Sequence, residues 1–117
     1  MRRRGFRREL RINDVIRTAI AGMIQRGEAG DLHFVTVTSV SVSPDLSFAK
    51  VYVSVLEEKN AKSIVSTLNE EAKHLRHLLG GEVRLRIIPV LKFYHDDSIV
   101  RGSRISSLID DVLKDKD

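Results

Sequence analysis

Cationic side chains gather in one short stretch of the sequence, EEAKHLRHLLGGEVRLRI, which spans residues 70–87. Lysine and arginine at this density neutralise phosphate groups, and arginine donates paired hydrogen bonds to phosphate oxygens. The chemistry that the stretch predicts is therefore binding of a polyanion. The side chains that we assign to this binding are Lys73, His74, Arg76, His77, Arg84 and Arg86.

A second basic cluster opens the chain, where residues 1–11 hold six arginines and a single acid, Glu9. The whole chain has a net charge of +4, so the part beyond residue 11 is slightly acidic. This asymmetry favours a polyanionic partner for a basic, flexible arm over residues 1–8, and a solubilising tail is the alternative. The arginines assigned to phosphate binding are Arg3, Arg4, Arg7, Arg8 and Arg11.

Residues that could support catalysis or bind a metal are few. His95, Asp96 and Asp97 follow a predicted strand, and His74 and His77 lie three residues apart, so a metal site or a hydrolase is conceivable. Exposed histidines and aspartates that cap backbone N–H groups explain these residues equally well. The sequence has no recognisable Ser–His–Asp spacing and no glycine motif that cradles phosphate. We therefore predict no enzymatic activity, no metal and no cofactor.

Apolar periodicity predicts the helices that position the basic side chains. Apolar residues recur at three- and four-residue steps over 8–28 and again over 58–79. The pair Gly80-Gly81 is expected to end the second helix. A short final helix is expected over 103–114. The last turns of the second helix therefore carry the first half of the basic stretch.

β-branched residues predict three strands. A hairpin is expected over 32–55, with its turn at Ser43-Pro44-Asp45. The alternation of valines changes phase inside the first strand, which predicts a bulge near Thr38 and Ser39. A third strand is predicted over 82–94, and it places the two arginines of this segment on one face.

These elements predict an α+β domain over residues 9–100, followed by a C-terminal helix or tail over residues 101–117. From periodicity alone the order is αββαβα, with helices on one face of a three-stranded sheet. No apolar run approaches the roughly 20 residues of a membrane span, and the absence of cysteine suits a reducing compartment. We therefore expect a cytoplasmic protein without a membrane partner, with a monomer as the default.

A helical wheel separates the basic and apolar residues of the second helix. Lys73, Arg76 and His77 fall on one ridge, opposite the core positions Leu75 and Leu79. Cations are also favoured at a helix C-terminus by its partial negative charge. A solvated face without a ligand is therefore the alternative to phosphate binding for these residues.

Aromatic residues do not predict a surface for base stacking. The chain has few of them, and most occupy strand positions that look like core. Recognition of backbone and shape is therefore favoured over the reading of a base sequence. The aromatic residues in question are Phe34, Phe48, Tyr52, Phe93 and Tyr94.

Three segments carry a resemblance to a known family. In this order, RINDVIRTAIAGMI, VTSVSVSPDLSFAKVYVS and LLGGEVRLRIIPVLKFYHDDS resemble the ribosome-binding factor A family, from about Arg8 to about Leu108. The resemblance implies a type II KH-like fold, αββααβ, with the second predicted helix divided in two. It also implies a bacterial, cytoplasmic, non-enzymatic protein that is associated with growth in the cold.

The resemblance also implies the partner. Members of the family bind the free 30S ribosomal subunit and assist late maturation of 16S rRNA, including processing at its 5′ end. Other assembly factors are further candidate partners. In this interpretation the basic run of residues 73–77 meets rRNA phosphates, the basic arm extends the footprint, and Arg84 and Arg86 contribute less.

One motif departs from the family's pattern. The family carries Ala-x-Gly at a kink between its last two helices, and the matching residues here are Ala72, Lys73 and His74. Histidine replaces the glycine, which is one of the usual causes of a sharp kink. Both a kinked helix and a straight one are therefore compatible with the sequence.

A function of a different class is compatible with the same elements. An open edge of the sheet could add a strand from a protein partner, with the basic arm serving only solubility. Binding of this kind would depend weakly on salt, whereas binding through phosphate contacts would depend on it steeply.

Overall fold

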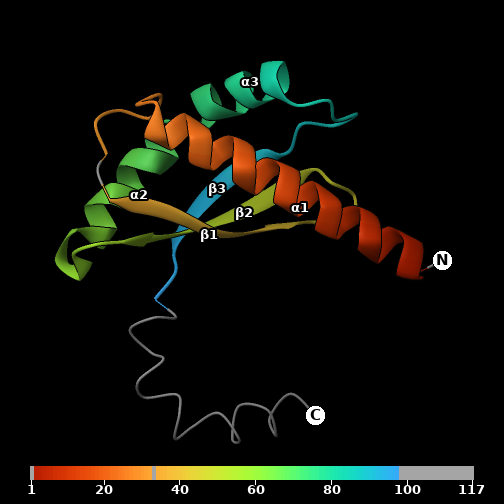
Figure 1. Ribbon diagram of the computed structural model, residues 1–117, viewed down its shortest axis with the longest axis horizontal. Coiled ribbons are helices and arrows are strands. Elements are labelled where there is room, and N and C mark those ends of the chain that lie inside the picture. Colours follow the sequence, from red (N-terminus) through yellow and green to blue (C-terminus); the bar gives the residue numbers. More distant parts are fainter. Residues whose placement is uncertain (1, 33, 98–117) are drawn as a thin grey trace, which may run out of the picture.

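The computed structural model describes residues 2–32 and 34–97, and it describes only the backbone of residues 2–6. The elements follow the order αββααβ (Figure 1), which confirms the predicted α+β class and the order that the resemblance implied. The helix expected over 103–114 lies outside the described residues. The elements are α1 (Arg2–Gln25), β1 (Val35–Val42), β2 (Phe48–Val55), the 3₁₀ turn η1 (Glu58–Asn60), α2 (Ala61–Glu70), α3 (Ala72–Glu82) and β3 (Val90–His95).

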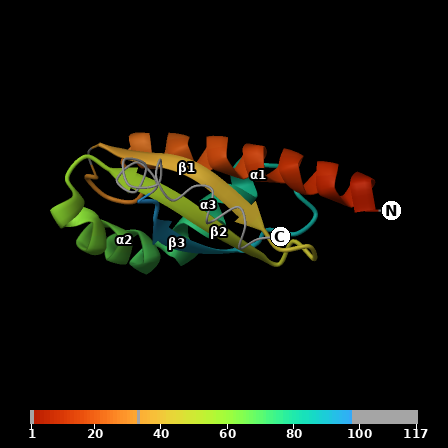
Figure 2. The ribbon, with the colours of Figure 1, turned by 90° about the horizontal axis from the view of Figure 1, so that it is seen from below.

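The three strands form one mixed sheet in the order β1-β2-β3. β1 and β2 are antiparallel, and β2 and β3 are parallel. The helices cover one face, as predicted (Figure 1), and Figure 2 views the sheet from the opposite side. Within the described part of the chain, no helix has the length and the apolar character of a membrane span.

The core lies between the helices and the covered face of the sheet. Alternate strand residues point into it, because side chains of a strand alternate between the two faces. The helices contribute the residues of their apolar stripes. The largest buried side chains of the core are Ile16, Ile20, Met23, Leu68, Leu75, Leu79, Val51, Val53 and Phe93.

The bulge predicted in β1 is confirmed. Val37 pairs with Val53 but Ser39 pairs with Tyr52, so Thr38 is the extra residue. Its hydroxyl donates a hydrogen bond to Asp96 Oδ2 at 2.5 Å and lies 3.2 Å from the Tyr52 carbonyl oxygen. The extra residue restores valines to the covered face beyond the bulge, which explains the change of phase in the sequence.

The turn between β1 and β2 is organised by one carboxylate. Asp45 Oδ1 accepts hydrogen bonds from the Ser43 hydroxyl at 2.7 Å, the Ser47 hydroxyl at 2.7 Å and the Ser47 backbone N–H at 3.1 Å. These bonds, led by the one from Ser43, hold the pKa of Asp45 below its ordinary value of 3.8. Leu46 follows with a φ of 63°, so the carboxylate supports a backbone conformation that leucine rarely adopts.

Replacement Asp45→Asn tests this role of the carboxylate. Because folding lowers the pKa of Asp45, its contribution to stability is present above 3.8 and is lost as the pH falls through the lower folded pKa. We expect the variant to melt below the wild type at neutral pH, with a difference that shrinks in acid. Thermal melts followed by circular dichroism over a pH series measure this. A difference in melting temperature that stays the same at every pH would contradict this role of the Asp45 carboxylate.

Two helix boundaries differ from the prediction. α1 begins at Arg2 rather than at residue 8, so the segment predicted as an arm continues the helix. Charge suggested the arm, yet arginine is a good helix former and extends a helix that packing has already begun. α3 runs through Gly80-Gly81 to Glu82. Glu82 is held at 2.9 Å by Arg26, which helps the helix to pass the glycines.

The third strand is shorter than predicted. It begins at Val90, and residues 83–89 form a loop. The parallel pairing explains this, because Val90 must lie opposite Phe48 at the start of β2, where its N–H bonds to the Ser47 carbonyl at 2.9 Å. The chain therefore has to cross back from α3 before pairing can begin. Arg84 and Arg86 consequently lie on the loop and not on a strand.

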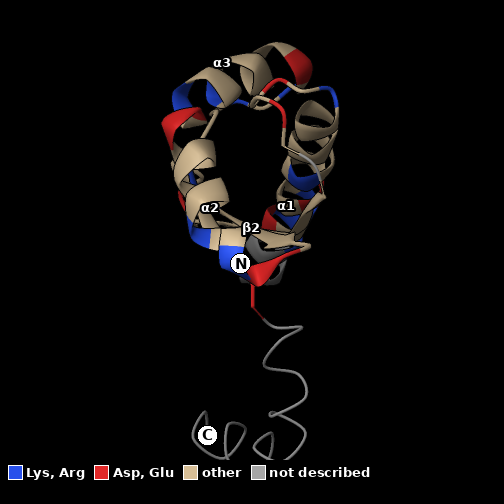
Figure 3. Ribbon diagram, turned by 90° about the vertical axis from the view of Figure 1, so that its left-hand side faces the viewer, with Lys and Arg blue, Asp and Glu red and all other residues tan. Residues whose placement is uncertain are grey.

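A single residue separates α2 from α3. Glu71 has φ −92° and ψ 3°, and its N–H contacts the carbonyls of Thr67 and Leu68, each at 3.1 Å. The straight-helix alternative is therefore wrong, and the break immediately precedes the motif Ala72-Lys73-His74. No glycine is needed, because Leu68 and Leu75 are both fully buried on either side of the break. Figure 3 shows the resulting change of direction, with α3 crossing between α2 and α1.

Candidate nucleic-acid interface

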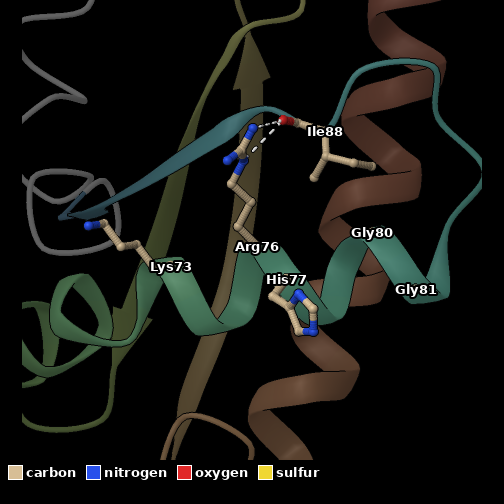
Figure 4. A pocket seen from close by; sticks show the side chains of 6 residues that line it. All are labelled: Lys73, Arg76, His77, Gly80, Gly81 and Ile88. Carbon is tan, nitrogen blue, oxygen red and sulfur yellow. Dashed lines mark hydrogen bonds between the residues drawn. The ribbon is translucent and has the colours of Figure 1, made fainter.

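The first group of predicted residues lies on α3. Lys73, Arg76 and His77 are exposed, whereas Leu75 and Leu79 are fully buried on the other side of the helix. The three cationic or titratable side chains line a surface hollow together with Gly80, Gly81 and Ile88 (Figure 4). The glycines lack side chains that would fill the hollow. We call this surface the α3 hollow.

Arg76 also has a structural role that the sequence analysis missed. Its Nε and Nη2 donate hydrogen bonds to the Ile88 carbonyl oxygen at 3.1 and 2.8 Å (Figure 4). The bonds tie α3 to the loop that leads into β3. The remaining N–H groups of the guanidinium stay available to a ligand. Because Ile88 lies twelve positions after Arg76, no local pattern in the sequence indicates this contact.

Replacement Arg76→Lys separates the two roles of this side chain. Lysine keeps the charge but has no planar pair of donors for the Ile88 carbonyl. We expect the free energy of unfolding to fall by about 1 kcal/mol, the usual net value of a hydrogen bond, and binding to a polyanion to change less than twofold or so. Chemical denaturation and a binding titration measure the two effects. A large loss of binding at unchanged stability would show that the guanidinium geometry itself is read by the ligand.

The second group lies where three segments meet. Arg84 and Arg86 of the loop share a hollow with Arg8 of α1 and with the hairpin turn. The structure thus brings one arginine of the N-terminal cluster beside two from the central stretch. We call this surface the loop hollow. Its lining residues are Arg8, Ile12, Pro44, Asp45, Leu46, Arg84, Leu85, Arg86 and Ile87.

The remaining predicted residues lie outside both hollows. Arg7 and Arg11 are exposed on α1, whose first half projects beyond the sheet (Figures 1 and 2). Arg3 and Arg4 belong to the first turns of α1, and their side chains lie outside the described structure. His74 is exposed in the first turn of α3 but does not line the α3 hollow.

Among the described residues, the exposed cations of the hollows form no ion pairs, although Asp45 also lines the loop hollow. Ion pairs in this part of the chain engage Arg17, Arg26, Lys59 and His95. Lys73, Arg84 and Arg86 form none. Two unpaired clusters of positive charge on neighbouring surfaces suit an extended polyanion better than a small anion.

The histidine and aspartates considered for a metal do not come together. Asp96 is bonded to Thr38, and His95 Nε2 lies 3.2 Å from a Glu58 carboxylate oxygen. Across residues 2–32 and 34–97, no group of three or more His, Cys, Asp or Glu side chains is placed to hold a metal ion.

Comparison with known proteins identifies the family. The family model described as ribosome-binding factor A matches residues 8–109 of this chain. The chain belongs to the ribosome-binding factor A family. Ribosome-binding factor A of Coxiella burnetii (strain Dugway 5J108-111) is 42% identical over 112 residues, which cover 94% of this chain and 93% of the relative.

Solved structures of the family share the fold. The crystal structure of ribosome-binding factor A from Thermus thermophilus matches with a TM-score of 0.67 and 29% identity, over 74% of this chain and 94% of that chain. A homology model of the Thermus thermophilus factor, fitted into a cryo-EM map of its 30S complex, matches with a TM-score of 0.58. That match has 31% identity and covers 71% of this chain and 89% of the other.

Proposed function

We propose that this protein binds the free 30S ribosomal subunit through phosphates of 16S rRNA and assists late maturation of that RNA, including processing at its 5′ end. It acts without catalysis, by charge and shape. The proposal includes a monomeric, cytoplasmic protein with other assembly factors as further partners. Its support is family membership together with the Thermus thermophilus relative whose coordinates were fitted into a 30S complex.

One observation on this chain carries the proposal. The α3 hollow and the loop hollow border the same loop, since Ile88 lines the first and Ile87 lines the second. The two groups of cations therefore meet at the loop of residues 83–89. Cations on both flanks of one loop can contact successive phosphates of an RNA backbone, and phosphate contacts position a protein on RNA without reading its sequence.

The alternative of strand addition is disfavoured at the β3 edge of the sheet and at one end of the β1 edge. At the β3 edge, the Asn69 amide bonds the Phe93 N–H at 2.8 Å and the Phe93 carbonyl at 3.0 Å. At the end of β1, Asn13 Oδ1 accepts the Val42 N–H at 2.9 Å. A partner strand would have to displace these side chains, because they already satisfy backbone groups that it would need.

Co-sedimentation over a salt series tests the proposal. Purified protein is centrifuged with free 30S subunits and, as a control, with assembled 70S ribosomes. We expect binding to the free subunit only, with a log–log salt slope of roughly one unit per phosphate contact. Absence of binding to 30S at low salt would contradict the proposal and leave the family relation as a relation of fold.

The maturation role has a separate readout. In a bacterial strain depleted of the protein, we expect 16S rRNA with an unprocessed 5′ end to accumulate, and expression of the wild-type chain to restore processing. Primer extension maps the ends. Normal 5′ ends of 16S rRNA after depletion would contradict the maturation role but would not contradict binding to the 30S subunit.

A further inference from the structure

The face of the sheet opposite the helices carries an ordered set of side chains. The parallel register of β2 and β3 places Phe48 beside Val90, Lys50 beside Lys92 and Tyr52 beside Tyr94. The intervening residues point into the core, where Ala49, Val51, Val53, Leu91 and Phe93 are buried. Because side chains of a strand alternate, the paired set lies on the face that none of the described helices covers.

The two tyrosines form an aromatic surface there. Their ring centroids are 5.6 Å apart with an interplanar angle of 29°, and the Lys92 ammonium lies 5.6 Å from the centroid of the Tyr94 ring. Both side chains are only partly buried. Of the five aromatic residues considered in the sequence, only Phe93 is buried, so the interpretation that most of them occupy core positions is wrong.

The lysine pair is unfavourable for the isolated fold. Like charges directly opposite on one face of a sheet destabilise it. Among the described residues, no carboxylate forms an ion pair with Lys50 or Lys92. A bound anion between these side chains would offset the repulsion. A ligand for this face has to neutralise the two lysines and stack on the two tyrosine rings. A polyanion that carries flat aromatic groups meets both requirements.

We infer that this face binds an unpaired stretch of RNA, with bases stacked on Tyr52 and Tyr94 and phosphates at Lys50 and Lys92. We call it the tyrosine platform. Base–aromatic stacking tolerates any base sequence, and a flanking pair of lysines follows the backbone. The platform is distinct from the α3 and loop hollows, which lie on the helices and the crossing loop. That the RNA is rRNA rests on the proposed function.

The chain supplies its own probe for this test. It contains two tyrosines and no tryptophan, so its intrinsic tyrosine fluorescence comes entirely from the platform. The wild-type full chain is titrated with a single-stranded oligouridylate and with an abasic oligomer of the same length and charge. We expect strong quenching by the oligouridylate and much less by the abasic oligomer. Equal effects of the two, or no effect, would overturn stacking.

Matched variants locate the contact, with affinity measured by fluorescence anisotropy of a labelled oligouridylate. Tyr52→Leu with Tyr94→Leu should weaken binding by roughly 30-fold or more, which is about fivefold or more for each stacked base, whereas Tyr52→Phe with Tyr94→Phe should retain it, since phenylalanine keeps the stacking surface. Lys50→Gln should weaken binding without lowering the melting temperature, because it removes a repulsion. Lys62→Gln, an exposed lysine on α2, is the control and should change neither.

The outcomes separate this inference from the proposed function. If the leucine variant sediments with 30S as well as the wild type does and the oligouridylate causes no quenching, the platform is refuted and 30S binding stands. If the oligouridylate quenches but the protein does not sediment with 30S, the platform stands and the proposed function fails. A tyrosine signal that depends on protein concentration, and not on RNA, would assign the face to a second copy and overturn the inference. Should the leucine variant fail to fold, Lys50→Gln decides the matter.

Discussion

Reversal of one charge in each hollow, Lys73→Glu with Arg84→Glu, is expected to weaken binding to the 30S subunit about 100-fold, on the order of tenfold for each lost phosphate contact. Both side chains are exposed and neither is ion-paired within the described structure. The fold should be unchanged, because neither contributes to the core. Arg76 is left intact, since its bonds to the Ile88 carbonyl would confound the result.

A control with the same change of net charge sharpens this prediction. Lys59→Glu with Lys62→Glu alters two exposed lysines of η1 and α2, and its 30S affinity should fall by less than about threefold through long-range repulsion alone. The salt slope of the hollow variant should drop by about two units, and that of the control should stay near the wild-type value. Equal losses in both variants would mean that net charge, and not the two hollows, governs binding.

Replacement Asn69→Asp is expected to destabilise the protein by about 2–3 kcal/mol at neutral pH. The amide now donates to the Phe93 carbonyl and accepts from the Phe93 N–H. A carboxylate keeps the acceptor but loses the donor, and it sets a negative charge against the carbonyl oxygen. Urea denaturation at neutral pH gives the free energy of unfolding. The exposed Asn60, whose side chain makes no capping bond, supplies the control Asn60→Asp, for which we expect almost no effect.

The deficit of Asn69→Asp should depend on pH. A protonated carboxyl group can donate to the Phe93 carbonyl, so folding should raise the pKa of the introduced group. The destabilisation is then full above that raised pKa and shrinks as the pH falls through it. A deficit of the same size throughout the acid range would show that the bond to the carbonyl is not what stabilises the α2–β3 contact.

Local patterns predicted those parts of the fold that depend on local geometry. The bulge at Thr38 follows from the alternation of side chains along a strand, because the valines change from odd to even positions within β1. The start of β3 does not, because it depends on where β2 begins, 42 positions earlier, since Val90 pairs with Phe48. Glu82 in the last turn of α3 pairs with Arg26 across the molecule, and no local propensity of Gly80-Gly81 carries that information.

The site divides in the same way. Exposure of Lys73 and His77 follows from the helical wheel, since Leu75 and Leu79 fix the buried side. Arg8 lies near Arg84 and Arg86 only because the loop packs beside α1. This packing is a tertiary contact that local sequence patterns do not predict. The stacking of Tyr52 on Tyr94 requires the parallel register. Alternation indicated that Tyr52 faces away from Val51 and Val53, but only the pairing supplies its neighbour.

The attachment of α3 determines which partner has to adapt on binding. Leu75 and Leu79 are buried in the core, and Arg26 pairs with Glu82 in the last turn of the helix. Arg76 donates hydrogen bonds to the loop that leads into β3. The helix is therefore pre-organised, and little of its conformational entropy is left to lose on association. A pliable RNA that meets such a rigid surface is expected to take the shape that the surface imposes. The protein would thus act as a template, and the rearrangement on binding should be found in the nucleic acid.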